Sequence, residues 1–422
     1  MFADIIRPIS LSFSLLRRFW PQLVALVLAG VLAGDLLMQL AARVALANHF
    51  AGLAMLTLVA LAQLVVTVAM FHVLRPGLPH LLAAQHSADK AAEEPAADRR
   101  GSRLVRMITI ALLPFFAYYA AWGFLGDIVR QYSRETLDQA DFGQSANVLD
   151  VLDSRWLLVS VAVSWLIRRL AKFMQTKSKT ASFWQIVVVI CETNWIFVGL
   201  YVISRWKDTA LQWLMSRSFW SVLQAAADGL ASPVPVATAA PMVPVELTSV
   251  APSTVAINLF FYMLLPLIWL VMAALIYGYD VRDDAALMRV HNRVERFGKR
   301  YAGLPKFLRD FVEHFIAGYR SRYLPIANGV RLTVSSSLLL LCTLVIGYRL
   351  IDWGAAWLWL GATRLIGPHE LDVWQIFSHG VTLLFGSPFQ DSSTGILIEP
   401  IRICFLAAVL ETAFSLSKGA AK

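Results

Sequence analysis

The sequence predicts an all-α fold: a polytopic transmembrane helical bundle of about eight spans, with amphipathic helices at the membrane interface. Hydrophobic residues make up 58% of the chain, and the mean hydropathy is +0.61. Charged residues make up only 15%, against about a quarter in soluble domains. The apolar residues are also gathered in long runs. Because backbone groups in hydrocarbon must hydrogen-bond internally, each run is expected to be a helix.

Eight runs approach or exceed the roughly 20 residues that cross a bilayer core. The whole chain, 1–422, is expected to form a single integral membrane domain. An amphipathic segment, 1–18, precedes the first run and is expected to lie along the inner interface. The first run lacks a small-residue cleavage site, so we interpret it as a retained span and not as a signal peptide. The expected spans are 20–42, 51–74, 107–129, 156–174, 183–204, 255–279, 332–351 and 395–416.

The distribution of basic residues orients these spans. The connections 75–106, 168–179 and 280–331 are rich in Lys and Arg, whereas the connection after the third span is acidic. Since cytoplasmic loops carry the excess of basic residues, both termini are expected in the cytoplasm and the protein in a plasma (inner) membrane. The net charge of +9 lies beside the spans. The expected partner is therefore the lipid bilayer, with anionic lipid at its cytoplasmic face, and not nucleic acid.

One outer segment and one inner segment suggest interfacial helices. Segment 205–254 predicts an interfacial helix with three tryptophans on one face, followed by a Pro-rich loop. These tryptophans suit a membrane anchor or a partner-binding stripe. Segment 280–331 predicts basic helices on the inner leaflet, or a solvated surface without a partner. The lipid-surface candidates are Trp206, Trp213, Trp220, Arg296, Lys299 and Arg300.

Segment 352–394 holds two apolar pieces, Trp353–Ile366 and Val373–Gly386. Each is too short to cross a bilayer comfortably. They fit outer interfacial helices, a re-entrant pair or an additional tilted hairpin. Because a hairpin adds two crossings, the expected number of spans is eight to ten.

Polar residues inside the spans are the candidate functional residues, since a charge in hydrocarbon is costly and usually faces protein or water. Asp35 follows two small residues, Gly30 and Gly34, whose spacing permits close helix approach. It is expected near the bundle interior, or solvated near the outer end of its span. Glu192 and Asn194 lie near the middle of the fifth span. They suit a proton or cation relay, or an interhelical hydrogen bond.

The other candidates lie in the seventh and eighth spans. Arg349 and Asp352 are three residues apart, as are Glu399 and Arg402, so each pair can meet on one helix face. We expect the two pairs to form one network at the outer ends of neighbouring helices, with a structural role. Glu411 falls nearer the inner end of its span and is expected to reach water.

Recognisable catalytic motifs are missing from the sequence. It contains no phosphate-binding Gly-rich loop with Lys and Ser or Thr, no His-Glu-x-x-His pattern and no Gly-x-Ser-x-Gly elbow. The eight histidines and three cysteines are scattered, which argues against a metal site. We therefore expect no cofactor and no enzymatic activity.

Three functions fit these observations. The first is a transport-type protein, meaning a carrier, a channel or a membrane subunit of an export system, which uses the intramembrane carboxylates. The second is a non-catalytic scaffold or accessory subunit that binds protein partners, further copies of the chain or anionic lipid. The third, a lipid-processing enzyme, requires a catalytic site that no motif in the sequence indicates.

Overall fold

A computed structural model describes residues 2–82, 99–121, 124–140, 156–177, 184–200, 252–277, 338–387 and 395–419. Within these ranges the regular structure is helical and contains no strand, which confirms the all-α prediction. The helices are α1 (Phe2–Ala47), α2 (His49–Leu74), the short 3-10 turn η1 (Arg75–Gly77), α4 (Arg99–Ala121), α5 (Phe124–Gln139), α6 (Trp156–Lys177), α9 (Pro252–Ile276), α12 (Leu338–Ile366), α13 (Leu371–Phe385) and α14 (Ile398–Gly419). A further apolar helix, Trp184–Leu200, lies between α6 and α9 in sequence.

The apolar helices identify a membrane protein. In the described part of the chain, three helices are long and apolar enough to cross a bilayer: Ile6–Ala47, His49–Gly77 and Leu339–Ile366. Three shorter apolar helices accompany them: Met107–Ala120, Trp184–Leu200 and Tyr262–Ile276. The total of eight spans therefore stays a prediction.

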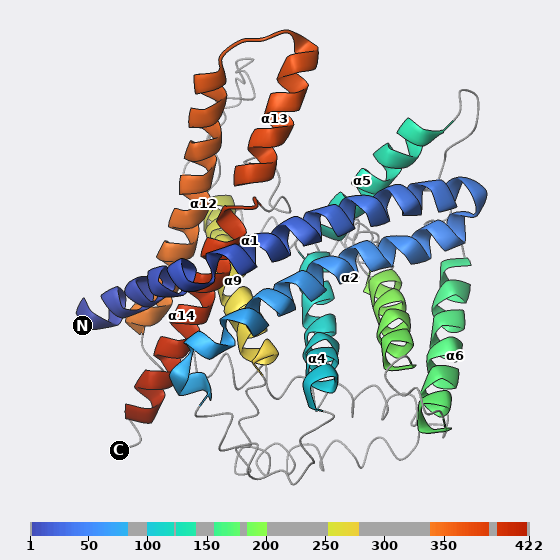
Figure 1. Ribbon diagram of the computed structural model, residues 1–422, viewed down its shortest axis with the longest axis horizontal. Helices are drawn as coiled ribbons and strands as arrows, with labels where there is room; N and C mark the ends of the chain where they lie inside the picture. The colour runs from blue at the N-terminus through green and yellow to red at the C-terminus, as the bar shows by residue number, and fades with distance from the viewer. Residues whose placement is uncertain are drawn as a thin grey trace, which may run out of the picture.

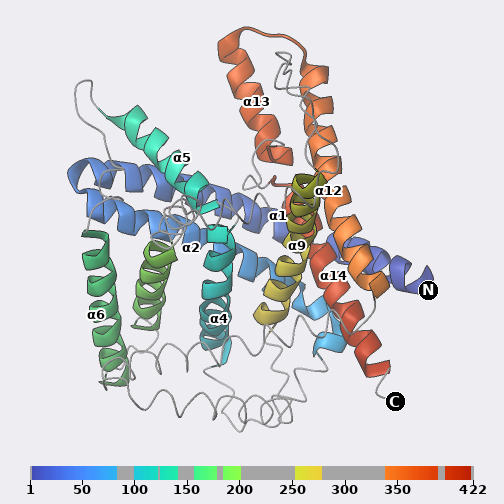
Figure 2. The same cartoon turned by 180° about the vertical axis from the view of Figure 1, so that it is seen from behind.

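The first two helices form a long antiparallel hairpin. Its turn is fixed by Asn48, whose side-chain oxygen accepts hydrogen bonds from the backbone N–H groups of Phe50 (3.0 Å) and Ala51 (3.2 Å). Such a cap satisfies donors that the start of a helix leaves without partners. Gly30 lets α1 approach α2, because a Cβ there would lie 2.7 Å from a methyl carbon of Val66. Figures 1 and 2 show α1 and α2 side by side across the molecule, with α4 and α6 steeply inclined to them.

The centre of the bundle is aromatic and aliphatic. Phe71 of α2 packs edge-on against Tyr277, whose hydroxyl donates to the Phe71 carbonyl oxygen over 2.9 Å. Phe116 of α4 packs edge-on against Phe197 of the helix Trp184–Leu200. These contacts join α2, α4, α9 and the helix Trp184–Leu200 around one hydrophobic core. The last helix, α14, also enters this core and contacts α1, α9 and α12.

Helix boundaries differ from the expected spans in two places. Segments 1–18 and 20–42 belong to one continuous helix of 46 residues, with Pro8 and Pro21 inside it. The expected span 107–129 is not one helix, because α4 ends at Ala121 and α5 begins at Phe124. The reason lies in composition: α5 carries acidic and basic residues throughout, so burying it in hydrocarbon would be costly.

The helix that begins in the seventh expected span continues into a helical hairpin. Residues 338–351 and the apolar piece Trp353–Ile366 are parts of one helix, α12, of 29 residues. The chain turns at Gly367, whose φ of +75° suits glycine, and returns as α13. Figures 1 and 2 show α12 and α13 standing out together beyond the rest of the bundle. Residues 252–254 of the expected segment 205–254 begin α9, whereas 205–251 and segment 280–331, with the Trp and basic candidates, lie outside the described residues.

Candidate functional site: the charged networks of the bundle

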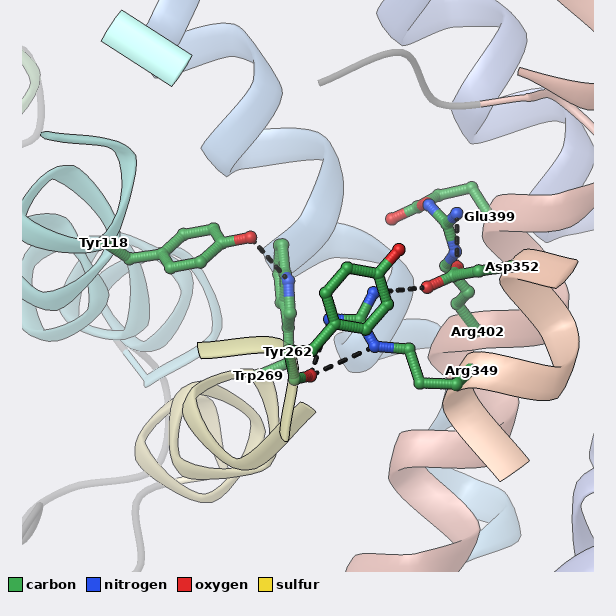
Figure 3. A network of polar contacts seen from close by, with 7 residues as sticks. All are labelled: Tyr118, Tyr262, Trp269, Arg349, Asp352, Glu399 and Arg402. Carbon is green, nitrogen blue, oxygen red and sulfur yellow. Dashed lines mark hydrogen bonds and ion pairs between the residues drawn. The ribbon is translucent and has the colours of Figure 1, made fainter. Parts of the chain in front are cut away.

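The largest charged network joins α12 to α14. Arg402 of α14 lies between two carboxylates: its Nη2 is 2.7 Å from Asp352 Oδ1, and its Nη1 is 3.4 Å from Glu399 Oε2. Arg349 Nη1 donates to the second oxygen of Asp352 over 3.2 Å. Figure 3 shows the four side chains converging from the two helices. The structure therefore brings together the four residues for which the sequence predicted a network.

A third helix enters this network through a backbone carbonyl. Arg349 Nε and Nη2 both donate to the carbonyl oxygen of Tyr262 in α9, over 3.1 and 2.6 Å. In a regular helix that oxygen would accept from the N–H four residues later, but that residue is Pro266, which has no N–H. The proline thus releases an acceptor that the guanidinium takes up. The Arg349 guanidinium also lies 3.7 Å from the centroid of the Tyr262 ring.

Aromatic rings lie beside this network. Tyr348 is buried and lies 5.8 Å from the Arg402 guanidinium. Further along α9, Trp269 donates its indole N–H to the hydroxyl of Tyr118 in α4 over 3.3 Å, as Figure 3 shows. The four charged side chains are between 10% and 24% exposed. Two cations and two anions balance, so the cluster is neutral and largely withdrawn from the surroundings.

A second, separate pair joins α6 to the helix Trp184–Leu200. Arg168 Nη2 lies 2.6 Å from Glu192 Oε1, and their side chains are 14% and 4% exposed. One turn earlier on α6, Ser164 Oγ accepts a hydrogen bond from Asn194 Nδ2 over 2.5 Å. The earlier residue of α6, Ser164, contacts the later residue of the other helix, Asn194, so the two helices are antiparallel. Both sequence candidates of the fifth span therefore contact the same neighbouring helix.

Glu411 forms a third kind of contact, with backbone. Its two carboxylate oxygens accept from the N–H groups of His80 (2.6 Å) and Leu81 (3.0 Å). These amides lie in the helical turn that starts at Pro79, where the first N–H groups lack helical partners and carry partial positive charge. We expected Glu411 to reach water, but only 3% of it is exposed. Glu411 is buried because the start of this turn supplies the hydrogen-bond donors that water would otherwise supply.

Asp35 is the exception among the acidic candidates. The sequence left two locations open, the bundle interior and a solvated position near the outer end of the span, and Asp35 lies exposed on α1. The reason is helical geometry: α1 contacts α2 through Gly30, and five residues further on a side chain points roughly 140° away. Its electrostatic neighbours are His379 of α13 and Glu135 of α5. Asp35 thus lies where α1, α5 and α13 come near one another, apart from the paired charges.

No family model, curated protein or solved structure matches this chain.

Two contributors to these networks were not predicted from the sequence. Arg168 was assigned to a basic connection, although its place one turn after Ser164 was a usable signal. Tyr262 acts through its backbone, and only the proline four residues later could have indicated it. Among the described residues, no group of three His, Cys, Asp or Glu side chains has the geometry for a metal ion. The arrangement therefore suits the joining of helices, and each buried carboxylate already has a cationic or amide partner.

Proposed function

We propose that this protein is a multi-pass accessory or scaffold protein of the inner membrane, with both termini in the cytoplasm. One observation carries the proposal. Every buried acidic side chain in the described part of the chain is paired, with an arginine for Glu192 and Glu399, or with helix amides for Glu411. The pairings of Glu192 and Glu411 join segments distant in sequence, whereas Glu399 pairs with Arg402 on its own helix, and Arg402 in turn reaches Asp352 of α12. The buried charges thus stabilise the association of helices. We therefore propose that the protein acts by binding partners or lipid, and not by moving a solute past these charges.

Energetics support this assignment. Removing one partner of a buried ion pair leaves an uncompensated charge and costs about 3–5 kcal/mol. A carboxylate that carries protons or cations must change its charge or its partner during each cycle, so it would incur a cost of this kind each time. Glu192 faces Arg168 at 2.6 Å, a short charge-assisted contact. Such a pair favours a fixed structure over a relay.

Transport is the second candidate, and one observation favours it. Asp352 is shared between two arginines, and Nε of Arg402 is buried without a hydrogen-bond partner. An anionic solute arriving at this network could replace Asp352 and use the remaining donor. In that case the network would exchange partners and would not simply hold helices.

The first experiment neutralises a pair without leaving a lone charge. A double variant, Arg168→Gln with Glu192→Gln, is expressed in a strain that lacks the native gene. If the pair is structural, the double variant folds and restores the growth phenotype. The matched control, Glu192→Gln alone, leaves Arg168 buried and gives less folded protein. A folded double variant that fails to restore growth would support transport through Glu192 and contradict the scaffold.

The second experiment addresses binding directly. Arg296, Lys299 and Arg300 are replaced together by glutamine, and photo-crosslinked proteins and bound anionic lipids are compared with those of the wild type. The scaffold function predicts the loss of specific crosslinked partners or of anionic lipid. The matched control removes three basic residues from another inner connection, Arg99, Arg100 and Arg103. An identical set of partners and lipids in all three proteins would overturn the proposal.

A further inference from the structure

The starting point is an apolar stripe along the outside of α12. Ile346, Leu350, Trp353 and Trp357 are 66%, 62%, 61% and 53% exposed. Their spacing of four, three and four residues keeps them on one face of the helix. Ile346 and Leu350 precede Asp352 along α12, and Trp353 and Trp357 follow it. The lipid-facing surface of the spanning part of α12 therefore continues without interruption into the hairpin.

The returning helix α13 has three distinct sides. One side contacts α12, where Trp359 donates its indole N–H to Thr382 Oγ1 over 3.0 Å. A polar side carries His379, which interacts electrostatically with Asp35 of α1. The third side is apolar and exposed. It consists of Val373, Ile376, Phe377 and Leu384.

Charge is absent from the sides of the hairpin and present at its tip. The sequence has no Asp, Glu, Lys or Arg from 353 to 363 or from 373 to 387. Arg364, Glu370 and Asp372 flank the turn at Gly367. A hairpin standing in water would expose a large apolar patch, which soluble surfaces avoid. Apolar sides with a charged tip are instead the distribution found where sides meet acyl chains and the tip meets headgroups.

Backbone groups at membrane depth must find their hydrogen-bond partners within the protein. The end of the hairpin opposite its tip meets this requirement. Gly395 and Ile396 are buried. The N–H groups of Ile396 and Leu397 donate to the carbonyl oxygens of Leu383 and Leu384, over 2.9 and 3.1 Å. Those carbonyls belong to the last turn of α13, where helical partners are lacking.

Helix lengths identify the kind of insertion. The 29 residues of α12 span about 43 Å, enough for a tilted crossing of a core of about 30 Å. The 15 residues of α13 span about 22 Å and fall short of a second crossing. We infer that α12 and α13 form a re-entrant hairpin immersed in the bilayer, with lipid acyl chains covering Trp357, Ile376 and Phe377. That the leaflet is the outer one rests on the proposed topology; the immersion itself is independent of the proposed function.

Thiol labelling tests the immersion. In a variant whose three native cysteines are replaced by alanine, single cysteines are introduced by Ile376→Cys on the apolar side and His369→Cys at the tip. The protein is reconstituted in phosphatidylcholine–phosphatidylglycerol vesicles and treated with a membrane-impermeant maleimide. Ile376→Cys is expected to react at least about tenfold more slowly than His369→Cys, because the reactive thiolate requires water. Equal rates in the folded protein would overturn the inference.

A second readout identifies what covers the apolar side. An environment-sensitive fluorophore is attached at Ile376→Cys in detergent, before reconstitution, and lipids carrying nitroxides on their acyl chains are then included in the vesicles. Immersion predicts strong quenching at this position and weaker quenching at His369→Cys. A protected thiol whose fluorophore is not quenched would show that protein, such as a second copy of the chain, covers the face, and would equally overturn the inference. Gln375→Cys, next to Ile376 in sequence but on the polar side of α13, is the matched control for Ile376→Cys.

Discussion

The network between α12 and α14 and the ion pair between α6 and the helix Trp184–Leu200 neutralise buried charge in different ways. In the network, Asp352 has two arginine partners and Arg402 has two carboxylate partners. In the ion pair, Arg168 and Glu192 face one another, and Ser164 with Asn194 adds one hydrogen bond beside them. Asp352 keeps Arg402 when Arg349 is removed, whereas removing either Arg168 or Glu192 breaks their ion pair. The comparison therefore predicts which residues are individually important.

The largest effect is expected for Arg402→Met. This change removes the cation that Asp352 and Glu399 share, and leaves Glu399 buried without its partner. We expect a loss of about 3–5 kcal/mol in the free energy of unfolding, measured by denaturant titration in detergent micelles. Arg402→Lys retains the charge but not the planar fork, and should lose less. A loss below about 1 kcal/mol for Arg402→Met, typical of an exposed pair, would contradict the shared network.

The next effect is expected for the pair of Arg168 and Glu192. Glu192→Gln should cost about 3 kcal/mol, because Arg168 keeps its charge in a buried position. Adding Arg168→Met should recover part of this loss, with a coupling energy of about 1–3 kcal/mol in the double-mutant cycle. The measurement is the same unfolding titration on the four proteins. Additive losses would show that the two side chains do not interact.

A smaller effect is expected for Arg349→Met, because Asp352 retains Arg402. The variant loses the hydrogen bonds to the Tyr262 carbonyl and should cost about 1–3 kcal/mol. In a Pro266→Ala background the restored N–H can satisfy that carbonyl, so the cost of Arg349→Met should fall by about 1 kcal/mol. The unfolding free energies of the four combinations provide the check. An unchanged cost would show that the contribution of Arg349 does not depend on the N–H group that Pro266 lacks.

The smallest effect is expected for Glu411→Gln. The amide oxygen still accepts one backbone N–H, but the favourable charge at the helix start is lost, and we expect a cost of about 0.5–1 kcal/mol. Glu411→Ala removes both acceptors and should cost more. Hydrogen exchange at His80 and Leu81 reports the contact directly. Unchanged protection of both amides in Glu411→Ala would show that the carboxylate does not cap this turn.

Composition and periodicity predicted the helical class and several boundaries. The expected span 51–74 corresponds to α2, and 395–416 to α14, within a few residues. The long apolar runs determine these helices locally, and the three-residue spacing of Arg349 with Asp352 is likewise a local signal. These features need no knowledge of neighbouring helices. They are therefore readable from the sequence.

Features that depend on neighbours were not readable in the same way. The partner of Glu192 lies 24 positions earlier, in a basic run that resembled a connection. The continuity of α12 through Asp352 was hidden because a charge there resembled the end of a span, whereas Arg402 of α14 neutralises it. The exposure of Asp35 depends on which residue of α1 meets α2. Each of these requires the packing that the sequence leaves unspecified.

The contact between Glu411 and the turn at Pro79 has a consequence for biogenesis. The carboxylate that caps the amides of His80 and Leu81 lies 331 and 330 positions later in the chain, in α14. Since a chain emerges from the ribosome N-terminus first, this turn must wait for the synthesis of α14 before the carboxylate can satisfy its donors. A nascent chain arrested before α14 would be expected to remain open at this end, and accessible to insertion chaperones and proteases.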